Sequence, residues 1–378
     1  MEAETLAPQA APVTRAEEKI FVASQWQLMW WRFRKHKLAV FSTIILAIMY
    51  TIILFGGFFA PYDPRANHVK FQYAPPQKIR FVDAEGRFHL RPFVYAYTGK
   101  MNPDSLRFTY TEDTTKPYPI LFFARGDPYT LLGKIKTDRH LIGVAEGGTL
   151  FLLGTEKQGR DLLSRIIIGG QVSLSIGLVG IAISFILGVL LGGISGYYGG
   201  ILDVIMQRII EFLRSVPTLP LWMALSAALP PRWSVLQVYF GIVIILSLIG
   251  WTGLARVVRS KFMSLREEDY IMAARLVGAS EMRIIIRHMV PSFASYLIAN
   301  ITMSVPGMIL GETTLSFIGL GLQPPALSWG VLLKDGQAVK TLNEAPWLLW
   351  PAIPVVIAVL AFNFMGDGLR DAADPYSR

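Results

Sequence analysis

Long runs without charged residues dominate the hydropathy pattern of this chain. A helix of about 20 apolar residues is needed to cross a hydrocarbon core of about 30 Å, and five runs reach that length. They cover residues 38–60, 166–202, 233–255, 289–311 and 345–366. We therefore predict a membrane-spanning helix at each of these positions.

A weaker sixth run covers residues 209–229, with two charged residues in its first turns and interruptions at Pro217 and Pro220. Short cytoplasmic segments collect Lys and Arg, and the segments 1–37 and 256–288 are both rich in them. These two segments share a side only if an even number of crossings separates them. The weak run must then cross as well, which predicts six spans with both termini in the cytoplasm.

The flanks of the spans predict further segments. Residues 1–37 are expected to form a cytoplasmic tail, disordered over 1–18, followed by an interfacial helix whose aromatic rings lie at headgroup depth. These rings belong to Trp26, Trp30 and Trp31. The first span, 38–60, is interpreted as an uncleaved anchor, because its apolar run exceeds the 7–15 residues of a signal peptide. Residues 371–378 are expected to be a second cytoplasmic tail.

About a hundred residues, 61–160, separate the first two spans, which is too many for a simple connection. Apolar and polar residues alternate on either side of Asp83-Ala84-Glu85-Gly86, which predicts a hairpin. Residues 120–123 and 150–153 are typical of further short strands. We expect a β-rich lobe on the external face. It is either a docking surface for an external partner or a lid packed on the helix ends. The remaining core, residues 161–370, is expected to carry spans two to six.

Composition agrees with a membrane protein. The chain is 52% hydrophobic and 17% charged, with a mean hydropathy of +0.42 and a net charge of +9, whereas soluble domains carry about 25% charged residues. The absence of Cys excludes disulfides, thiolate metal sites and Cys nucleophiles. No GxxxxGK[ST] motif is present, and the five His residues are scattered without an HExxH motif. We expect no metal, no cofactor and no nucleotide site in this chain.

Small and polar residues recur inside the spans at helical spacing. In the second span they form a stripe that lets another helix approach closely, either within the chain or in a second subunit. The stripe consists of Ser173, Gly177, Gly180, Ser184, Gly188, Gly192 and Gly196. In the fifth span Asn300 and Ser304, with Glu312 just beyond it, predict either a solute pathway or hydrogen bonds between helices. The strong spans hold no charged residue in their interiors, which disfavours a proton-coupled carrier.

The loop within 256–290 is the most informative segment. Acidic residues predict the start of a helix, Gly278 predicts a turn, and a basic amphipathic piece leads back to the membrane at Pro291. This pattern predicts a compact helical elbow on the inner face. Its candidate docking residues are Glu268, Tyr270, Met272, Ala273, Ala274, Arg275, Gly278, Ala279, Arg283 and Pro291.

This loop resembles the coupling loop of ABC importer permeases, whose pattern is Glu-Ala-Ala, three residues, Gly, nine residues, Ile, any residue, Leu, Pro. Ala273, Ala274, Gly278 and Pro291 match at the required spacing, while Met272 stands in the position of the Glu.

Two further stretches are similar to the C-type subunit of the dipeptide/oligopeptide permease family. One precedes span two and the other follows span five. The residues that carry the similarity are Gly154, Thr155, Gly159, Arg160, Asp161, Ser164, Arg165, Ser316, Gly319, Gly321, Pro324, Pro325, Trp329 and Gly330.

The resemblance implies an all-α permease with the type I importer fold and a β-rich insert after its first helix. Such a chain forms half of a translocation pathway in a bacterial inner membrane and works by alternating access. It pairs with a second permease, two subunits that bind ATP and Mg, and an extracytoplasmic binding protein. It is not itself an enzyme. Peptides are the expected solute and oligosaccharides the alternative; a secondary carrier or a membrane enzyme is disfavoured.

Overall fold

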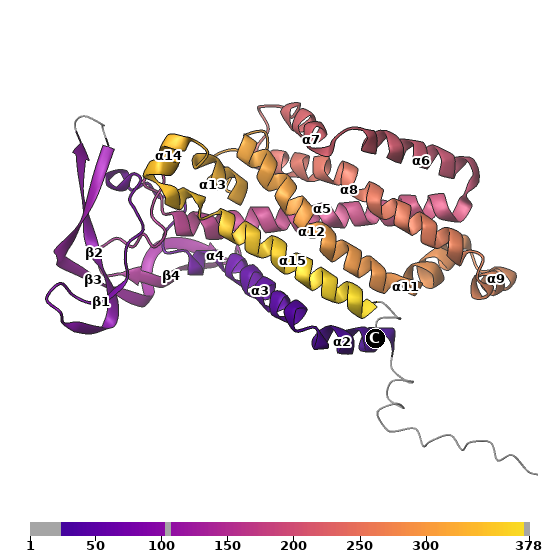
Figure 1. Ribbon diagram of the computed structural model, residues 1–378, viewed down its shortest axis with the longest axis horizontal. Helices are drawn as coiled ribbons and strands as arrows, with labels where there is room; N and C mark the ends of the chain where they lie inside the picture. Colours follow the sequence, from indigo (N-terminus) through magenta and orange to yellow (C-terminus); the bar gives the residue numbers. More distant parts are fainter. Residues whose placement is uncertain (1–23, 103–106, 374–378) are drawn as a thin grey trace, which may run out of the picture.

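The computed structural model describes residues 24–102 and 107–373, so the expected tail 1–18 lies outside the described residues. Long helices run side by side, and a small sheet stands at one end of them (Figure 1). Among the described residues five helical segments are long and apolar enough to cross a membrane. They are α3 (Lys37–Leu54), α5 (Leu162–Tyr198), α8 (Val235–Leu265), α12 (Ala294–Ile318) and α15 (Ala352–Ala373) with the 3-10 turn η3 (Pro346–Leu349) before it. The five strong spans are confirmed.

The sixth run is not the single helix expected over 209–229. The structure has α6 (Gly200–Ser215) and α7 (Thr218–Ala227), separated at Val216 and Pro217. Proline has no N–H to donate and pushes the preceding residue out of the helical region, and Val216 is extended at ψ 132°. Together α6 and α7 bring the chain back from the end of α5 to the start of α8 (Figure 1). Neither helix is among the five that are long and apolar enough to cross, so the sixth span stays a prediction.

The fifth span, predicted to end at residue 311, extends further, because α12 continues to Ile318 and ends at Gly319, whose φ is 89°. A buried carboxylate without hydrogen bonds would be costly inside a span. The hydroxyl groups of Ser173 and Ser316 donate to the buried Glu312 carboxylate, so the helix continues through it. The chain after α12 contains α13 (Trp329–Asp335) and α14 (Val339–Glu344).

The small-residue stripe of α5 packs within the chain. A Cβ on Gly192 would overlap the backbone of Ala255 on α8, and one on Gly177 would lie 2.9 Å from the side chain of Ile309 on α12. The hydroxyl of Ser247 on α8 donates to the Gly180 carbonyl at 3.0 Å. Of the two alternatives for this stripe, intrachain packing is the one the structure contains.

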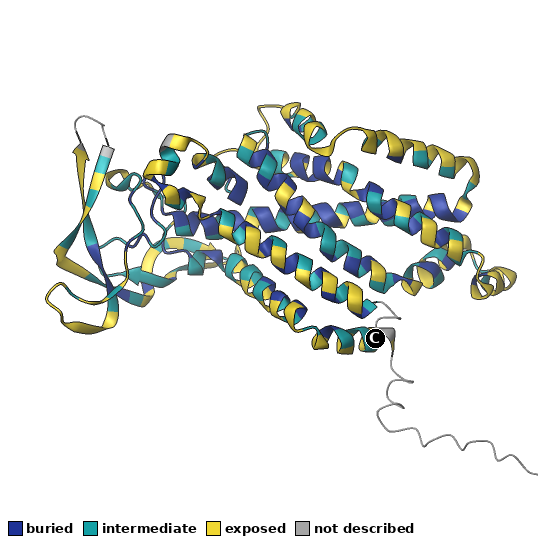
Figure 2. Ribbon diagram, viewed as in Figure 1, coloured by how far each residue is buried: buried dark blue, intermediate teal, exposed yellow. Residues whose placement is uncertain are grey.

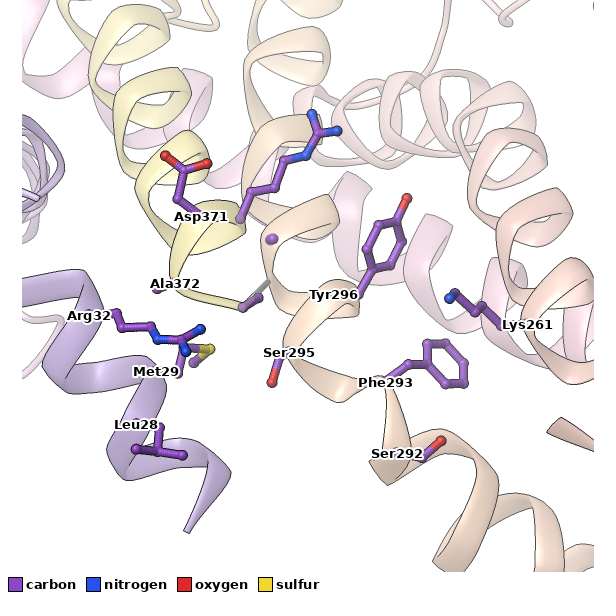
Figure 3. Close-up of a pocket in the computed structure, with 13 residues that line it drawn as sticks. Leu28, Met29, Arg32, Lys261, Ser292, Phe293, Ser295, Tyr296, Asp371 and Ala372 are labelled. Atoms are coloured by element: carbon purple, nitrogen blue, oxygen red, sulfur yellow. The ribbon is translucent and has the colours of Figure 1, made fainter. Parts of the chain in front are cut away.

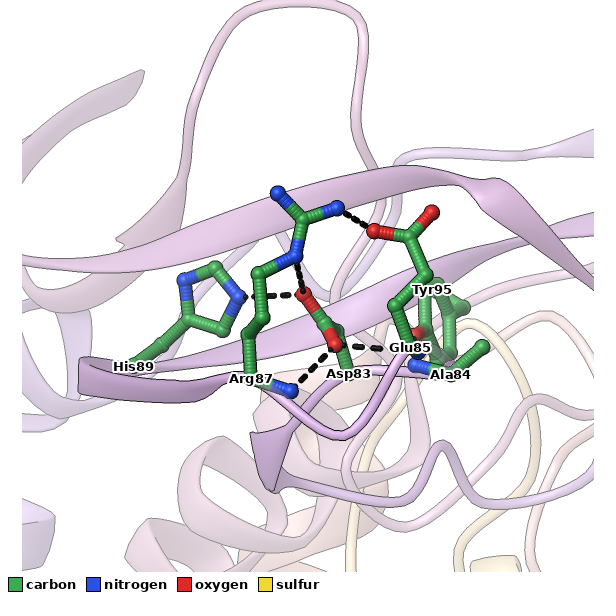
Figure 4. Close-up of polar contacts among 6 residues, drawn as sticks. All are labelled: Asp83, Ala84, Glu85, Arg87, His89 and Tyr95. Carbon is green, nitrogen blue, oxygen red and sulfur yellow. Dashed lines mark hydrogen bonds and ion pairs between the residues drawn. The ribbon is translucent and has the colours of Figure 1, made fainter.

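The lobe between α3 and α5 contains one antiparallel sheet of four strands in the order β1-β2-β3-β4. Its elements are the 3-10 turn η1 (Val69–Phe71), β1 (Arg80–Val82), β2 (Phe88–Asn102), β3 (Arg107–Leu131) and β4 (Ile135–Val144). The predicted hairpin is therefore confirmed, as is a strand through residues 120–123. The side chain of Asp83 closes the hairpin turn: it accepts from the backbone N–H of Glu85 and Arg87 and lies 2.9 Å from His89 (Figure 4).

The strand expected at residues 150–153 is wrong. Leu150 and Phe151 are fully buried and lie outside any strand, and residues 152 and 153 form a turn. The backbone N–H of Phe151 donates to the side-chain oxygen of Gln77 at 2.6 Å, and its carbonyl accepts from the Gln77 backbone at 2.9 Å. One glutamine therefore supplies the hydrogen bonds that a neighbouring strand would have supplied.

At the other end of the bundle, α2 (Gln25–Lys35) is confirmed as a helix, capped by Ser24. It packs on α15 through Phe33 and Ala372, while Trp26, Trp30 and Trp31 are exposed. Figure 2 shows the buried residues concentrated on α5, α8 and α12, whereas α2, α3 and α6 carry much exposed surface.

Candidate functional site: the elbow and the polar residues of the bundle

The loop after α8 folds into the predicted elbow. Helix α9 (Asp269–Leu276) follows Glu268 at its N-cap, and the chain then turns at Gly278, whose φ is 80°. The N–H of Gly278 bonds the Arg275 carbonyl at 2.9 Å, and that of Ala279 bonds the Ala274 carbonyl at 3.0 Å. This is the Schellman pattern, which requires a left-handed residue after the helix. Gly278 meets that requirement without strain.

A short helical segment leads from the turn back to the bundle. It consists of α10 (Glu281–Ile284), the π-helical turn η2 (Ile285–Met289) and α11 (Val290–Ser292), which contains Pro291.

Buried apolar side chains fix the elbow to the bundle. Ile271 and Ile284 are almost fully buried and pack in a cluster with Phe262, Met289 and Phe293. Two polar contacts add to this anchor at the end of α5. The Tyr198 hydroxyl donates to Glu281 at 2.7 Å, and the Arg275 guanidinium lies 5.2 Å from the centroid of the Tyr197 ring.

The outer surface of the elbow is apolar and basic. Leu276 and Val277 are 89% and 88% exposed, and Met282 is 62% exposed. Exposed aliphatic side chains grouped on a projecting segment mark a contact surface. These three were missed by the sequence reasoning, although an apolar pair next to the turn glycine was a usable signal. The predicted residues Tyr270, Met272, Ala273, Arg275 and Arg283 are also exposed, and Ala274 and Ala279 are partly buried.

The motif before α5 joins the lobe to the bundle. Thr155 bridges segments far apart in sequence: its hydroxyl accepts from the Ala74 backbone at 2.8 Å, and its carbonyl accepts from the Trp347 indole at 2.9 Å. Gly154 and Gly159 both have positive φ, and a Cβ on either would approach other backbone closely. Arg160 pairs with the buried Glu156 at 2.6 Å. These residues hold two parts of the chain together.

Asp161 caps the N-terminus of α5 by accepting from the backbone and the hydroxyl of Ser164 at 2.7 and 2.6 Å. Complete burial raises the pKa of this carboxyl to about 6, because desolvation outweighs the hydrogen bonds from Ser164. Its other oxygen has no hydrogen-bond partner. Beside it, Arg165 is buried and donates to the Pro64 carbonyl at 3.4 Å.

The motif at the end of α12 forms a second junction. Glu312 accepts from Ser173 on α5 at 3.1 Å and from Ser316 at 2.8 Å. Ser173 in turn accepts from the Trp329 backbone at 3.0 Å. Gly321 and Gly330 each lie where a Cβ would be 2.6 Å from a backbone atom. Gly319, Pro324 and Pro325 form the turn between α12 and α13. These hydrogen bonds therefore join α5, α12 and α13 at one junction.

Of the three predicted pathway residues, two lie together. Asn300 and Ser304 line a small cavity of about 150 Å³, shared with Ser184 on α5 and with Gly250 and Gly253 on α8. Glu312 lies elsewhere, fully buried in the junction just described.

A larger cavity of about 650 Å³ lies between α2, α12 and α15 (Figure 3). Its lining includes Arg32, Lys261, Tyr296 and Arg370, which come from four helices and were not predicted. Within the described ranges, no group of three or more His, Asp or Glu residues is arranged to hold a metal ion.

The long apolar helices and the projecting elbow define a multi-pass helical membrane protein. The family model described as "Binding-protein-dependent transport system inner membrane component" matches residues 188–378, and that for the "N-terminal TM domain of oligopeptide transport permease C" matches residues 24–76. The chain belongs to this family of transport-system membrane components, and its resemblance to C-type dipeptide/oligopeptide permeases is confirmed.

Named relatives agree with this assignment. The oligopeptide transport system permease protein OppC of Haemophilus influenzae is 42% identical over 64% of this chain and 76% of its own length. The dipeptide transport system permease protein DppC of Lactococcus lactis subsp. cremoris is 33% identical over 93% of this chain and 91% of its own length. A solved structure of the MetNI methionine ABC transporter, inward facing, aligns with a TM-score of 0.42 at 19% identity, covering 55% of this chain and 95% of that one.

Proposed function

We propose that this chain is a permease subunit of an ATP-driven importer and forms half of the translocation pathway for dipeptides or oligopeptides. Two of its relatives are named as oligopeptide and dipeptide permeases. The match to the Lactococcus protein covers 93% of this chain and so includes most of the external lobe. A relative that matches along this region and is named for dipeptides favours a peptide over an oligosaccharide.

The elbow is the observation that carries the coupling role. It projects beyond the ends of the long helices, it is anchored by Ile271 and Ile284, and it presents Leu276 and Val277 to the surroundings. A rigid segment with an exposed apolar pair fits a groove in a partner, and Arg275 and Arg283 add charges that suit acidic residues there. The proposed partners are two ATP-binding subunits, which hold the ATP and Mg.

Alternating access follows from this arrangement. Closure of the ATP-binding subunits moves the two elbows of the permease pair, and each elbow moves the helices to which it is fixed. Changing the ratio of two states from 1:99 to 99:1 takes about 5.5 kcal/mol, which is within reach of nucleotide binding at two sites. Asn300 and Ser304 are the proposed pathway residues in this chain, opposite a second permease chain. An extracytoplasmic binding protein delivers the solute.

The proposed orientation places the elbow and α2 in the cytoplasm and the lobe outside a bacterial cytoplasmic membrane. The basic segments before α3 and after α8 lie at one end of the bundle (Figure 1). This is the distribution of the positive-inside rule.

The test is purification of the assembled complex from its native membrane through a tag on this chain, followed by reconstitution into liposomes. The proposal expects a second permease and two ATPases to copurify, and uptake of a labelled peptide that requires ATP and the binding protein. Recovery of the chain without any ATPase, or uptake driven by an ion gradient in the absence of ATP, would overturn it.

A further inference from the structure

The hairpin formed by β3 and β4 belongs to the sheet of the lobe at its base, and its turn lies against the membrane-spanning helices. In Figure 1, β4 runs next to α4 (Gly56–Phe59), the short helix that follows α3. The Tyr129 ring of β3 rests on Gly57, where any Cβ would overlap it. The buried His140 of β4 has its ring nitrogens 2.6 Å from the Ala60 carbonyl oxygen and 2.9 Å from that of Asp127. The hairpin is thus held firmly at the outer end of α3 and α4.

The turn of this hairpin reaches down to the spans themselves. A cavity of about 520 Å³ is lined on one side by residues 130–133 of the turn and on the other by Ile53 and Leu54 of α3 and Leu174 and Leu178 of α5. These helix residues lie inside the uncharged runs that cross the membrane. The turn is therefore at the depth of the outer part of the hydrocarbon layer.

The surface of the turn suits that depth. Leu132 and Ile135 are 52% and 59% exposed, and they continue the exposed apolar face of α3, to which Ile48 and Leu54 belong. Above the turn, the ring centroids of Phe123 and Phe58 are 6.0 Å apart. The two apolar rings extend the apolar surface between the hairpin and α4.

Charge on the hairpin has the sign that phospholipid headgroups attract. In the part where β3 pairs with β4, residues 120–144, four cations stand against two acids, of which Asp127 accepts a hydrogen bond from the Asp63 backbone at 2.8 Å. The cations are Arg125, Lys134, Lys136 and Arg139, and the other acid is Asp138. Lys134 and Lys136 flank the exposed Ile135, and long lysine side chains extend from apolar surroundings to phosphates at the interface.

We infer that the β3–β4 turn, residues 131–136, inserts into the outer leaflet and binds anionic phospholipid. Leu132 and Ile135 enter the acyl region, an acyl chain occupies the groove against α3 and α5, and Lys134 and Lys136 contact the phosphates. Part of the lobe is thus a membrane anchor. This inference depends on α3 and α5 crossing the membrane and not on the identity of the solute.

Because this chain contains no Cys, an introduced Cys is the only site in it for a thiol-reactive spin label. Leu132→Cys carries a spin label, and its collision rates with oxygen and with a water-soluble nickel chelate are measured in nanodiscs containing phosphatidylglycerol. Ile48→Cys on α3 serves as the lipid-facing control, and Leu90→Cys, on a side chain that is 88% exposed on β2, as the water-facing control.

The inference expects the oxygen-to-nickel ratio at position 132 to match that at 48 and to exceed that at 90 severalfold. A ratio like that of position 90 places the turn in water and overturns the inference. Low collision rates with both reagents place the turn under a second protein subunit, and this result overturns the inference as well.

The lysine contacts are tested with Lys134→Gln and Lys136→Gln together. The ratio at position 132 should fall when phosphatidylglycerol is replaced by phosphatidylcholine in the parent, and the double variant should lose that lipid dependence. Lys78→Gln with Lys116→Gln removes the same charge elsewhere on the lobe and should keep it. Equal lipid dependence in both double variants rules out the phosphate contact.

Discussion

The Arg259 guanidinium on α8 forms a bidentate ion pair with the Asp203 carboxylate on α6, through Nε to Oδ1 and through Nη2 to Oδ2 at 2.5 Å. The Ser195 hydroxyl on α5 donates to the same carboxylate at 2.5 Å. One aspartate therefore joins three helices at the end of the bundle where the elbow begins. Bidentate arginine–carboxylate pairs fix geometry as well as adding stability.

Asp203→Asn is expected to loosen this junction. Both side chains of the ion pair are less than a third exposed, and hydrogen bonds to charged groups contribute about 1.5–3 kcal/mol. The thermal midpoint of the purified complex in detergent should fall clearly. Arg208→Gln breaks an ion pair on the same helix whose side chains are 76% and 59% exposed, and exposed pairs contribute little. A midpoint that is lowered equally by both variants contradicts the structural role of Asp203.

Gly192→Ala is expected to separate α5 from α8. Its Cβ would overlap the backbone oxygen of Ala255, which has no rotamer by which to move away. Overpacking of this kind costs about 1–3 kcal/mol. Gly307→Ala on α12 is the matched control, because a Cβ there meets nothing within 4 Å. Yield and thermal midpoint should drop for the first variant and remain unchanged or rise slightly for the second. Two equal midpoints would show that the close approach is absent.

The spans and the elbow were predictable because each depends on local rules. Lipid imposes a minimum length on any crossing helix, and that length is visible as an uncharged run. The elbow depends on Gly278, whose spacing from the following proline is also visible in the sequence. The break in the sixth run at Pro217 was signalled as well, although its consequence, two separate helices, was not drawn.

Other features depend on partners distant in sequence. Glu312 remains inside a helix because Ser173, 139 residues away, donates to it. Phe151 lies outside any strand because Gln77 satisfies its backbone, and the backbone N–H of Leu150 donates instead to the Tyr62 hydroxyl. The exposure of Leu276 and Val277 depends on the direction in which the elbow projects. A single sequence contains these residues but not their neighbours in space.

Stability at the junction between lobe and bundle should depend on pH through Asp161. Burial raises the pKa of its carboxyl from 3.8 to about 6. The folded protein therefore holds a proton that the unfolded chain has released between about pH 4 and 6. Stability is full below that window and is lost as the pH rises through it, by about 3 kcal/mol at 1.36 kcal/mol per pKa unit.

Asp161→Asn should flatten this dependence while keeping the helix cap, because Asn caps a helix about as well as Asp. Thermal midpoints in detergent from pH 4.5 to 7.5 give the comparison. The parent should lose stability with rising pH more steeply than the Asn variant, and Glu146→Gln, at an exposed position, should behave like the parent. Parallel profiles for the parent and Asp161→Asn would refute the assignment.

Gly278→Leu is expected to uncouple transport. A non-glycine residue in the left-handed region costs about 1–2 kcal/mol, and a leucine there also adds bulk to the proposed docking surface. Membrane insertion should be normal, whereas ATP-dependent uptake should fall severely. Gly86→Leu is a matched control in the hairpin between β1 and β2, where φ is also positive, at 82°, and a Cβ meets nothing within 4 Å. Its uptake should be close to that of the parent. Normal uptake by Gly278→Leu would exclude a coupling role for this turn.

Asn300→Leu separates the two interpretations of the polar residues in α12. If Asn300 and Ser304 line the solute pathway, a leucine fills the cavity of about 150 Å³ and removes its polar group, so peptide uptake falls while the complex keeps its thermal midpoint. If Asn300 instead serves helix packing, the thermal midpoint of the complex falls. Thr302→Val is the control on the same helix: its side chain is 8% exposed, and its hydroxyl donates to the Ile298 carbonyl at 2.9 Å, within the helix itself. That variant should leave uptake near the parental rate.

Because the cavity also contains Ser184, Ser184→Ala should change the relative uptake of peptides of different length, whereas a purely structural role for the cavity leaves that preference unchanged.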